Sequence, residues 1–123
     1  MNEWVPFEAR IVPRGQPSKA ERAIVALTGA IDMMNAPEVE RVFSAAIDDR
    51  YVDLVADMAG VEFIDVDGLE TLAGVAHDVR DVGGNLMLRS PNELTRRICQ
   101  LIELDTILPV EEDATEKPYV SGR

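Results

Sequence analysis

Short apolar segments alternate with segments of helical periodicity along most of this chain. Residues 23–27, 52–58 and 85–88 are apolar and have the length of buried strands, whereas residues 35–50 and 69–82 repeat apolar side chains every three to four positions. A strand, a helix and a second strand in this order form a parallel strand pair joined by a right-handed crossover. The sequence therefore predicts an α/β fold with helices packed on a largely parallel sheet.

Two further segments extend this pattern toward the two ends of the chain. Residues 7–12 predict a first strand that forms an antiparallel hairpin with residues 23–27, and residues 107–110 predict a short last strand. We expect one domain over residues 1–112, with a mixed sheet of four to five strands and helices mainly on one face. Residues 113–123 are polar and are expected to form a flexible tail.

A third helix is expected after the strand at residues 85–88. Ser90 is the expected cap, Pro91 the first helical residue and Glu93 the acidic residue of a capping box. The apolar face expected to pack on the core consists of Leu94, Ile98, Leu101 and Ile102. Cys99, the one cysteine of the chain, belongs to the same apolar pattern and is expected to be a buried, inert thiol.

The charge of the chain restricts its partners. The 23 acidic residues outnumber the 12 basic ones, which gives a formal net charge of −11. Nucleic-acid-binding proteins carry a basic surface, so nucleic acid is not an expected partner, whereas basic proteins are. No run approaches the roughly 18 apolar residues needed to cross a bilayer, and no signal peptide is visible at the amino end. We therefore expect a soluble, cytoplasmic protein without a membrane partner.

The segment from Phe63 to Leu69 joins the third expected strand to the second expected helix and carries two carboxylates and a glycine. A helix start has N–H groups without intrahelical partners and a partial positive charge, so it favours acidic side chains or phosphate groups. Asp67 is expected to cap this helix, with Glu70 completing a capping box. Asp65 is either a loop residue that bonds to its own backbone or a partner contact. We expect the function to depend on this junction.

A second group of candidate residues follows the second expected strand. Asp32 is expected at the same end of the sheet as the junction, either as a turn residue or as a partner contact. Asn35 is expected to cap the first helix, with Glu38 three residues later. Met33 and Met34 are adjacent, so a regular element cannot turn both of them inward. Either one of them is exposed near the junction, where Met is a flexible contact for a partner surface, or both are partly buried.

Three segments of the chain form a recognisable set when they are taken in order. Residues 29–36 read Gly-Ala-Ile-Asp-Met-Met-Asn-Ala, residues 63–69 read Phe-Ile-Asp-Val-Asp-Gly-Leu, and residues 83–84 are a Gly-Gly pair after the second expected helix. On this β/α pattern they resemble the G-x-[LI]-D-x-x-[TN]-A, F-x-D-S-S-G-L and Gly-Gly segments of the STAS domain, the module of bacterial anti-sigma factor antagonists. The resemblance covers residues 7–112 and implies a single STAS-like domain.

The resemblance implies a role in partner switching. In this family an unphosphorylated antagonist binds an anti-sigma factor that is also a serine kinase, and this binding frees the sigma factor. The kinase phosphorylates the second serine of the D-S-S-G segment, and the complex then dissociates. The resemblance therefore implies a non-enzymatic regulatory protein whose partner is an anti-sigma factor of the serine-kinase type. The oligomeric state stays open between a monomer and a weak dimer.

This chain departs from the family at the phosphorylated position. Val66 replaces the first serine and Asp67 replaces the phosphoacceptor, so neither side chain offers a hydroxyl. Phosphorylation adds a charge of about −1.5 to −2, whereas Asp supplies about −1 with two acceptor oxygens. Asp67 is therefore either a permanent, partial mimic of the phosphorylated form, which a conventional kinase partner would bind weakly, or a charge that a basic residue of an adapted partner meets.

The candidate site combines both groups of residues with Thr71, a hydroxyl residue close to the junction. Asp67 is the phosphoacceptor equivalent, and the expected partner-binding residues are Asp32, Met33, Met34, Asn35, Asp65, Val66, Asp67, Gly68 and Thr71. The sequence contains no recognisable catalytic set, metal-ligand spacing or cofactor motif, so we expect no enzyme and no cofactor. His77, the one histidine, has no partner at ligand spacing and is expected on the surface.

Two alternatives remain open for the function. Clustered carboxylates could bind Mg²⁺ as in a receiver domain that is phosphorylated on Asp, with Asp32, Asp57, Asp65 and Asp67 as candidates. The acidic pair after the first strand and the late Lys of such a domain are not in place, however. The chain could also be a ligand-sensing or scaffold STAS module without a kinase partner, because a fold does not determine a function.

Overall fold

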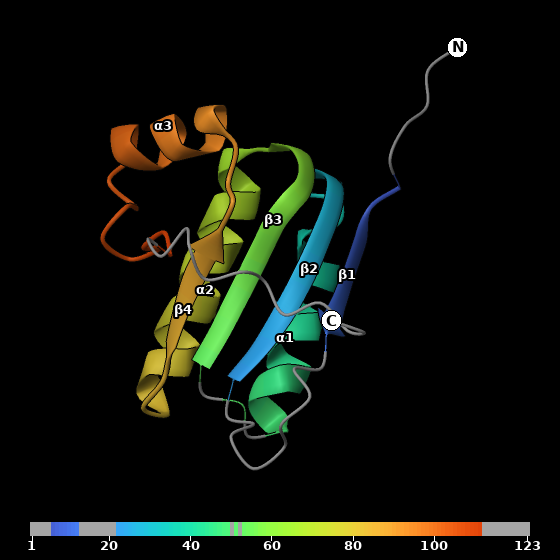
Figure 1. The fold of residues 1–123 in the computed structure, drawn as a ribbon, viewed down its shortest axis with the longest axis vertical. Coiled ribbons are helices and arrows are strands. Elements are labelled where there is room, and N and C mark those ends of the chain that lie inside the picture. Colours follow the sequence, from blue (N-terminus) through green and yellow to red (C-terminus); the bar gives the residue numbers. More distant parts are fainter. Residues whose placement is uncertain (1–5, 13–21, 50, 52, 112–123) are drawn as a thin grey trace, which may run out of the picture.

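Four strands form one sheet in the computed structural model, which describes residues 6–12, 22–49, 51 and 53–111 (Figure 1). The strands are β1 (Glu8–Val12), β2 (Arg22–Ile31), β3 (Asp53–Ile64) and β4 (Asn85–Arg89), and their order in space is their order in the chain. β1 pairs with β2 antiparallel, whereas β2 with β3 and β3 with β4 are parallel. The predicted α/β fold, with a mixed sheet and an antiparallel hairpin at its edge, is confirmed.

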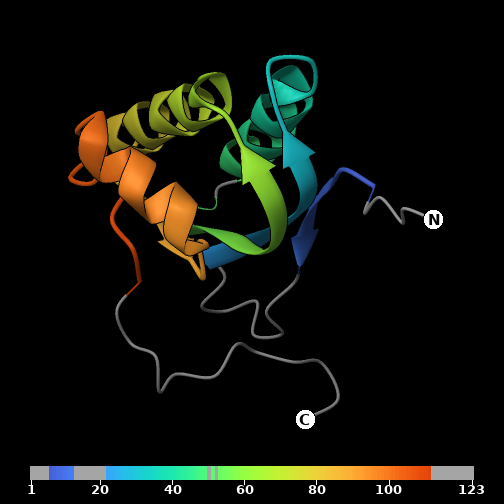
Figure 2. The ribbon, with the colours of Figure 1, turned by 90° about the horizontal axis from the view of Figure 1, so that it is seen from above.

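The described helices are α1 (Ala36–Asp48), α2 (Val66–Asp81) and α3 (Glu93–Leu101). Figure 2 shows α1 and α2 side by side on one face of the sheet, as predicted. α3 lies at the end of the sheet where β3 passes into α2 (Figure 1). None of the described helices has the length and apolar character required to cross a membrane.

The core lies between the sheet and the inner faces of α1 and α2. Phe43 of α1 and Leu72 of α2 are fully buried in it. Alternate residues of the strands face these helices, and they include Val25, Leu27, Leu54, Ala56, Met58, Leu86 and Leu88. Burial of each large apolar side chain contributes about 1.5–3 kcal/mol, so this layer is the main source of stability.

β3 is longer than the sequence analysis predicted. It continues past Met58 to Ile64, because Val61 and Ile64 remain buried and pair with the end of β2. The pairing shifts register near Gly29, whose φ of 86° lies in the left-handed region that glycine adopts without strain. Val52, the first residue of the predicted strand, lies outside the described residues. The extension carries β3 directly to the junction with α2.

The start of α3 differs from the prediction. Asn92, and not Ser90, is the N-cap, and its Oδ1 accepts a hydrogen bond from the Thr95 N–H at 2.8 Å. Ser90 has a φ of 56°, a left-handed conformation, whereas a capping residue is normally extended. The helix therefore begins at Glu93, two residues later than a Ser90 cap would place it.

The buried face of α3 also differs from the prediction. Thr95 and Cys99 are buried, whereas the predicted core residues Leu94, Leu101 and Ile102 are exposed. The reason is the position of α3 at the end of the sheet, where it packs through a narrow stripe and not through a broad face (Figure 1). The buried thiol at Cys99 was predicted correctly.

The chain after α3 returns to the outer edge of β4. The strand predicted at residues 107–110 is reduced to a single parallel bridge between Val110 and Leu88. The sheet therefore has four strands and one added bridge within the described part of the chain. The tail predicted at residues 113–123 lies outside the described residues.

Candidate functional site

Two strand-to-helix connections meet at one end of the sheet. β2 and β3 are parallel neighbours whose last residues, Ile31 and Ile64, are paired. The Asp65 N–H donates to the carbonyl oxygen of Ile31 at 3.0 Å, which ties the two connections together at their bases. The connection from β2 to α1 and the connection from β3 to α2 therefore form one continuous region (Figure 1).

The β3–α2 connection is capped by Asp65. This residue is extended, with a ψ of −179°, and its Oδ1 accepts a hydrogen bond from the Gly68 N–H at 2.8 Å. Its carbonyl oxygen accepts from the Leu69 N–H at 3.0 Å, which is the first bond of the helix. Asp67 lies two residues inside the helix, so the prediction that Asp67 is the cap was wrong. The cap position was displaced because β3 reaches Ile64 and leaves only Asp65 to make the turn.

Gly68 sets how closely α2 approaches the strands. A Cβ at this position would lie 2.8 Å from Cγ1 of Ile64 and 3.0 Å from Cγ2 of Ile31, both on buried side chains. Only a residue without a side chain fits there without displacing the core. Because Gly68 holds this turn against the sheet, the two residues before it, Val66 and Asp67, lie on the outer side of the turn and are exposed.

The first turn of α2 presents a carboxylate to solvent. Asp67 is exposed, and Thr71, one turn further, is half-buried. Within the described part of the chain, no ion pair or side-chain hydrogen bond engages the Asp67 carboxylate. The partial positive charge of a helix start stabilises a negative charge at this position by about 0.3–1 kcal/mol. Asp67 therefore carries its charge without neutralisation by a neighbouring side chain.

The β2–α1 connection is held by a network of side-chain hydrogen bonds. Oδ1 of Asp32 accepts from the N–H groups of Met34 at 2.9 Å and Asn35 at 3.3 Å. Oδ1 of Asn35 accepts from the Asp32 N–H at 2.9 Å, and its Nδ2 donates to the carbonyl oxygen of Ala30 at 2.8 Å. Asn35 occupies the N-cap position of α1 but makes no capping bond, so its predicted side-chain cap was wrong. Its amide closes the loop instead.

This loop turns both methionines outward. The exposed fractions are 66% for Met33 and 83% for Met34, and on the neighbouring connection they are 45% for Phe63 and 43% for Val66. The prediction that one methionine could be exposed therefore understated the exposure. We call these four apolar side chains, together with the Asp67 carboxylate, the junction surface.

Phe63 is a member of the junction surface that the sequence analysis did not single out. It pairs with Ala30 of β2, and it directly precedes Ile64, which is buried in the core. Because neighbouring residues of a strand point to opposite faces, a buried Ile64 places Phe63 on the other face. This alternation was the available signal, but it required knowing that the strand continues through these residues.

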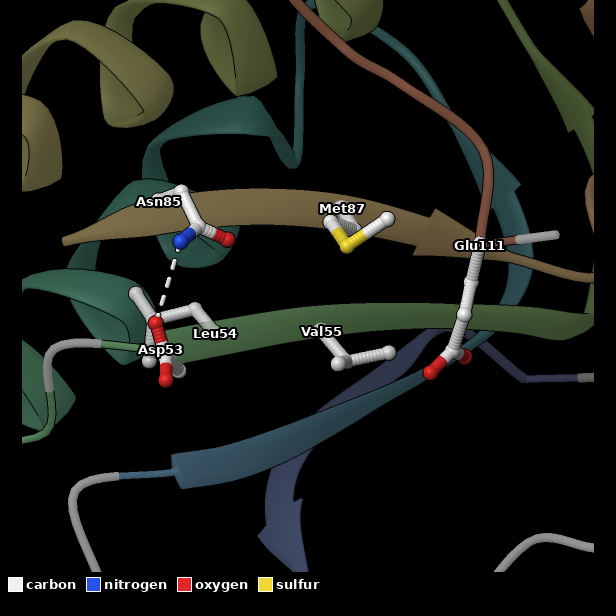
Figure 3. A pocket seen from close by; sticks show the side chains of 6 residues that line it. All are labelled: Asp53, Leu54, Val55, Asn85, Met87 and Glu111. Carbon is white, nitrogen blue, oxygen red and sulfur yellow. Dashed lines mark hydrogen bonds between the residues drawn. The ribbon is translucent and has the colours of Figure 1, made fainter. Parts of the chain in front are cut away.

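A cavity of about 320 Å³ lies elsewhere, on the face of the sheet opposite α1 and α2 (Figure 3). Asn85 Nδ2 donates to Asp53 Oδ1 at 3.1 Å at one end, and Val55 and Met87 lie between this pair and Glu111 at the other end. Asp53 and Asn85 form the first residue pair of β3 and β4. Asp53 pairs with Arg22 of β2 and Ile64 with Ile31, so nine residues of β2, about 30 Å at the normal strand rise, separate the two ends. The cavity is therefore separate from the junction surface, and no predicted site residue lines it.

The carboxylates considered for Mg²⁺ binding are not brought together. Asp57 pairs with Ala26 of β2, five residues or about 17 Å before the Ile31–Ile64 pair, and its carboxylate accepts a hydrogen bond from the Ala59 N–H at 3.1 Å. Among the residues that the structure describes, no three His, Cys, Asp or Glu side chains form a possible metal site.

Burial, with a smaller contribution from Asp105, raises the pKa of the Cys99 thiol, which is far from the junction surface in sequence.

The fold and the junction surface define a small α/β module with an exposed apolar and acidic region beside the start of α2. The model of the STAS domain matches residues 14–116, and the chain belongs to this family. The structure is similar to an anti-sigma factor antagonist from Mycobacterium paratuberculosis, with 25% sequence identity, a TM-score of 0.74 and 89% of each chain covered. It is also similar to the anti-sigma factor antagonist SpoIIAA in its unphosphorylated form, with 20% identity, a TM-score of 0.61, and 78% of this chain and 83% of that chain covered.

The same fold occurs in a protein of another kind. The murine solute carrier 26 family member A9 anion transporter has a TM-score of 0.67 and 15% identity, and the match covers 82% of this chain but 19% of that chain. The resemblance to the STAS family that the sequence predicted is confirmed. Because the fold is shared by antagonists and a transporter, the function has to be argued from the junction surface.

Proposed function

We propose that this chain is a non-enzymatic regulatory protein that binds an anti-sigma factor of the serine-kinase type through the junction surface. The observation that carries this proposal is the exposure of four large apolar side chains around the segment that corresponds to the antagonists' D-S-S-G motif. Family membership and the similarity to antagonist structures support it.

Exposed apolar clusters of this kind favour a protein partner. Clustered apolar side chains on a small soluble domain typically mark an interaction site, and Met and Phe are enriched at interface centres. Met33 and Met34 stand on a loop fixed by Asp32 and Asn35, so little loop entropy is lost when a partner binds. The surface is therefore preorganised for docking and does not have to form during it.

The proposed cycle does not depend on phosphorylation at position 67. A serine kinase transfers a phosphoryl group to a hydroxyl, and neither Val66 nor Asp67 has one. SpoIIAA has been solved in both unphosphorylated and phosphorylated forms. In this chain the Asp67 carboxylate supplies permanently about half of the charge that a phosphoserine supplies transiently. We propose that the partner binds independently of phosphorylation at position 67, and that another event sets when the partner is bound.

The proposal is tested by a charge placed in the junction surface. Met34→Glu should weaken the binding of the purified kinase-type anti-sigma factor from the same genome by at least about tenfold, because about 1.4 kcal/mol of apolar contact is lost. Isothermal titration calorimetry measures the change in affinity. Val82→Glu is the matched control, since Val82 is 54% exposed but lies at the opposite end of α2. Equal binding by both variants, or no binding by the unmodified chain, would contradict the proposal.

A further inference from the structure

We infer that the partner presents an arginine or lysine side chain to Asp67, so that the fixed charge attaches the partner and does not repel it. This inference rests on the proposed function, because it concerns the partner of the same junction surface. It decides between the two roles that the sequence left open for Asp67.

The three aspartates of the two connections differ in whether their carboxylates are available to a partner. Asp32 and Asp65 each use Oδ1 to accept backbone N–H groups of their own connections. Asp67 is exposed beside Val66 and has no such bond within the described residues. Of the three aspartates of the two connections, Asp67 is therefore the one whose carboxylate faces outward without an internal partner.

Docking of a partner changes the surroundings of the Asp67 carboxylate. A partner that covers Phe63, Val66 and the two methionines also removes water from the Asp67 carboxylate, which follows Val66 in the first turn of α2. Leaving a charge of this kind unpaired in an interface weakens binding by about thirtyfold to several thousandfold. The positive end of α2 offsets only a factor of about two to five. Docking on this surface is therefore favourable only when the partner supplies a compensating cation.

Neither of the two connections supplies this cation from its own residues. Residues 30–36 and 62–71, which form the two connections and their flanks, contain five carboxylates and no Lys or Arg. The net charge of −11 adds a long-range attraction for a basic surface. A partner with apolar side chains around one Arg or Lys complements both the apolar side chains and the charge of the junction surface, whereas a partner that requires an uncharged serine there does not.

The experiment first identifies the partner at the junction surface itself. A photo-reactive amino acid replaces Met34, which is the most exposed of the apolar residues there, and the chain is irradiated in its native host. Mass spectrometry of the cross-linked peptide then names the partner and the segment that faces the junction surface. We expect an Arg or Lys in that segment, and its absence would overturn the inference.

The affinity of the purified partner is then measured by calorimetry at low and at moderate salt. Asp67→Asn and Asp67→Ser should each weaken binding by about thirtyfold or more and reduce its dependence on salt. Asp78→Asn is the matched control, because Asp78 is an exposed carboxylate of the same helix about 17 Å further along it. Unchanged or tighter binding by Asp67→Asn would overturn the inference and identify Asp67 as a repelling mimic.

The outcomes separate this inference from the proposed function. A cross-linked anti-sigma factor that binds Asp67→Asn as well as the unmodified chain supports the proposed function and overturns the inference. A partner of another class that loses affinity for Asp67→Asn supports the inference and overturns the proposed function. No cross-linked protein would overturn both.

Discussion

The two connections that build the junction surface are held in place by different physical means. The β3–α2 connection is fixed by packing, because Gly68 lies against Ile64 and Ile31 and Asp65 caps a helix of 16 residues. The β2–α1 connection is fixed by the hydrogen bonds of Asp32 and Asn35 within the loop. One half of the surface is therefore an extension of the core, and the other half is a loop that stabilises itself.

This difference predicts how each half responds to mutation. Changes in the packed half alter the free energy of unfolding together with binding, because the same residues serve the core. Changes in the loop half alter binding with little effect on folding, because Met33 and Met34 contact mainly solvent. The separation explains how such a surface can diverge at its contacts while the fold stays intact. The following substitutions test it.

The largest effect is expected at the closest contact of the packed half. Gly68→Ala should destabilise the protein by about 1–3 kcal/mol, measured by urea unfolding, because the new Cβ would meet Ile64 Cγ1 at 2.8 Å. Gly74→Ala on the same helix has no atom within 4 Å of its Cβ and should stabilise the protein by up to about 1 kcal/mol.

Because both variants gain the same helix propensity, the difference between them isolates the cost of the contact. Similar free energies of unfolding for Gly68→Ala and Gly74→Ala would show that α2 does not depend on close approach to the sheet at Gly68. The packed half would then resemble the loop half, and the comparison between them would lose its basis.

A smaller effect is expected from the cap of the packed half. Asp65→Ala should lower the free energy of unfolding by about 1 kcal/mol, because the Gly68 N–H loses its acceptor at the start of α2. Asp67→Ala removes only the favourable interaction with the helix start and should cost less, about 0.3–1 kcal/mol. Denaturation of the two variants side by side measures the difference, and a larger loss for Asp67→Ala would restore Asp67 as the cap.

The choice between these two caps shows where sequence reasoning reached its limit. Asp65 and Asp67 offer the same chemistry two residues apart, and either could bond an N–H three residues later. The choice is made by the end of β3, which depends on the pairing of Ile64 with Ile31 across the sheet. A pairing between segments more than thirty residues apart leaves no local signal at the cap itself.

The parts that were predictable depend on local periodicity. The alternation of strands and helices, the buried Cys99 and the stop of α2 at the Gly83-Gly84 pair all follow from short-range patterns. Gly83 has a φ of 90°, the left-handed conformation expected just after a helix. The buried face of α3 could not be predicted in this way, because its apolar stripe fits a helix on a sheet face, whereas this helix lies at the sheet end.

The smallest effect is expected in the loop half, at the counterpart of Asp65. Asp32→Ala removes the acceptor of the Met34 and Asn35 N–H groups, but these groups lie near solvent and water can replace the carboxylate. The free energy of unfolding should therefore change by no more than about 0.5 kcal/mol, measured by urea unfolding beside Asp65→Ala. Both aspartates accept backbone N–H groups of their own connections, so the difference between them measures what packing adds to such a bond. An equal loss for both would mean that the β2–α1 loop is coupled to the core as tightly as the β3–α2 connection, and that its methionines cannot vary independently of the fold.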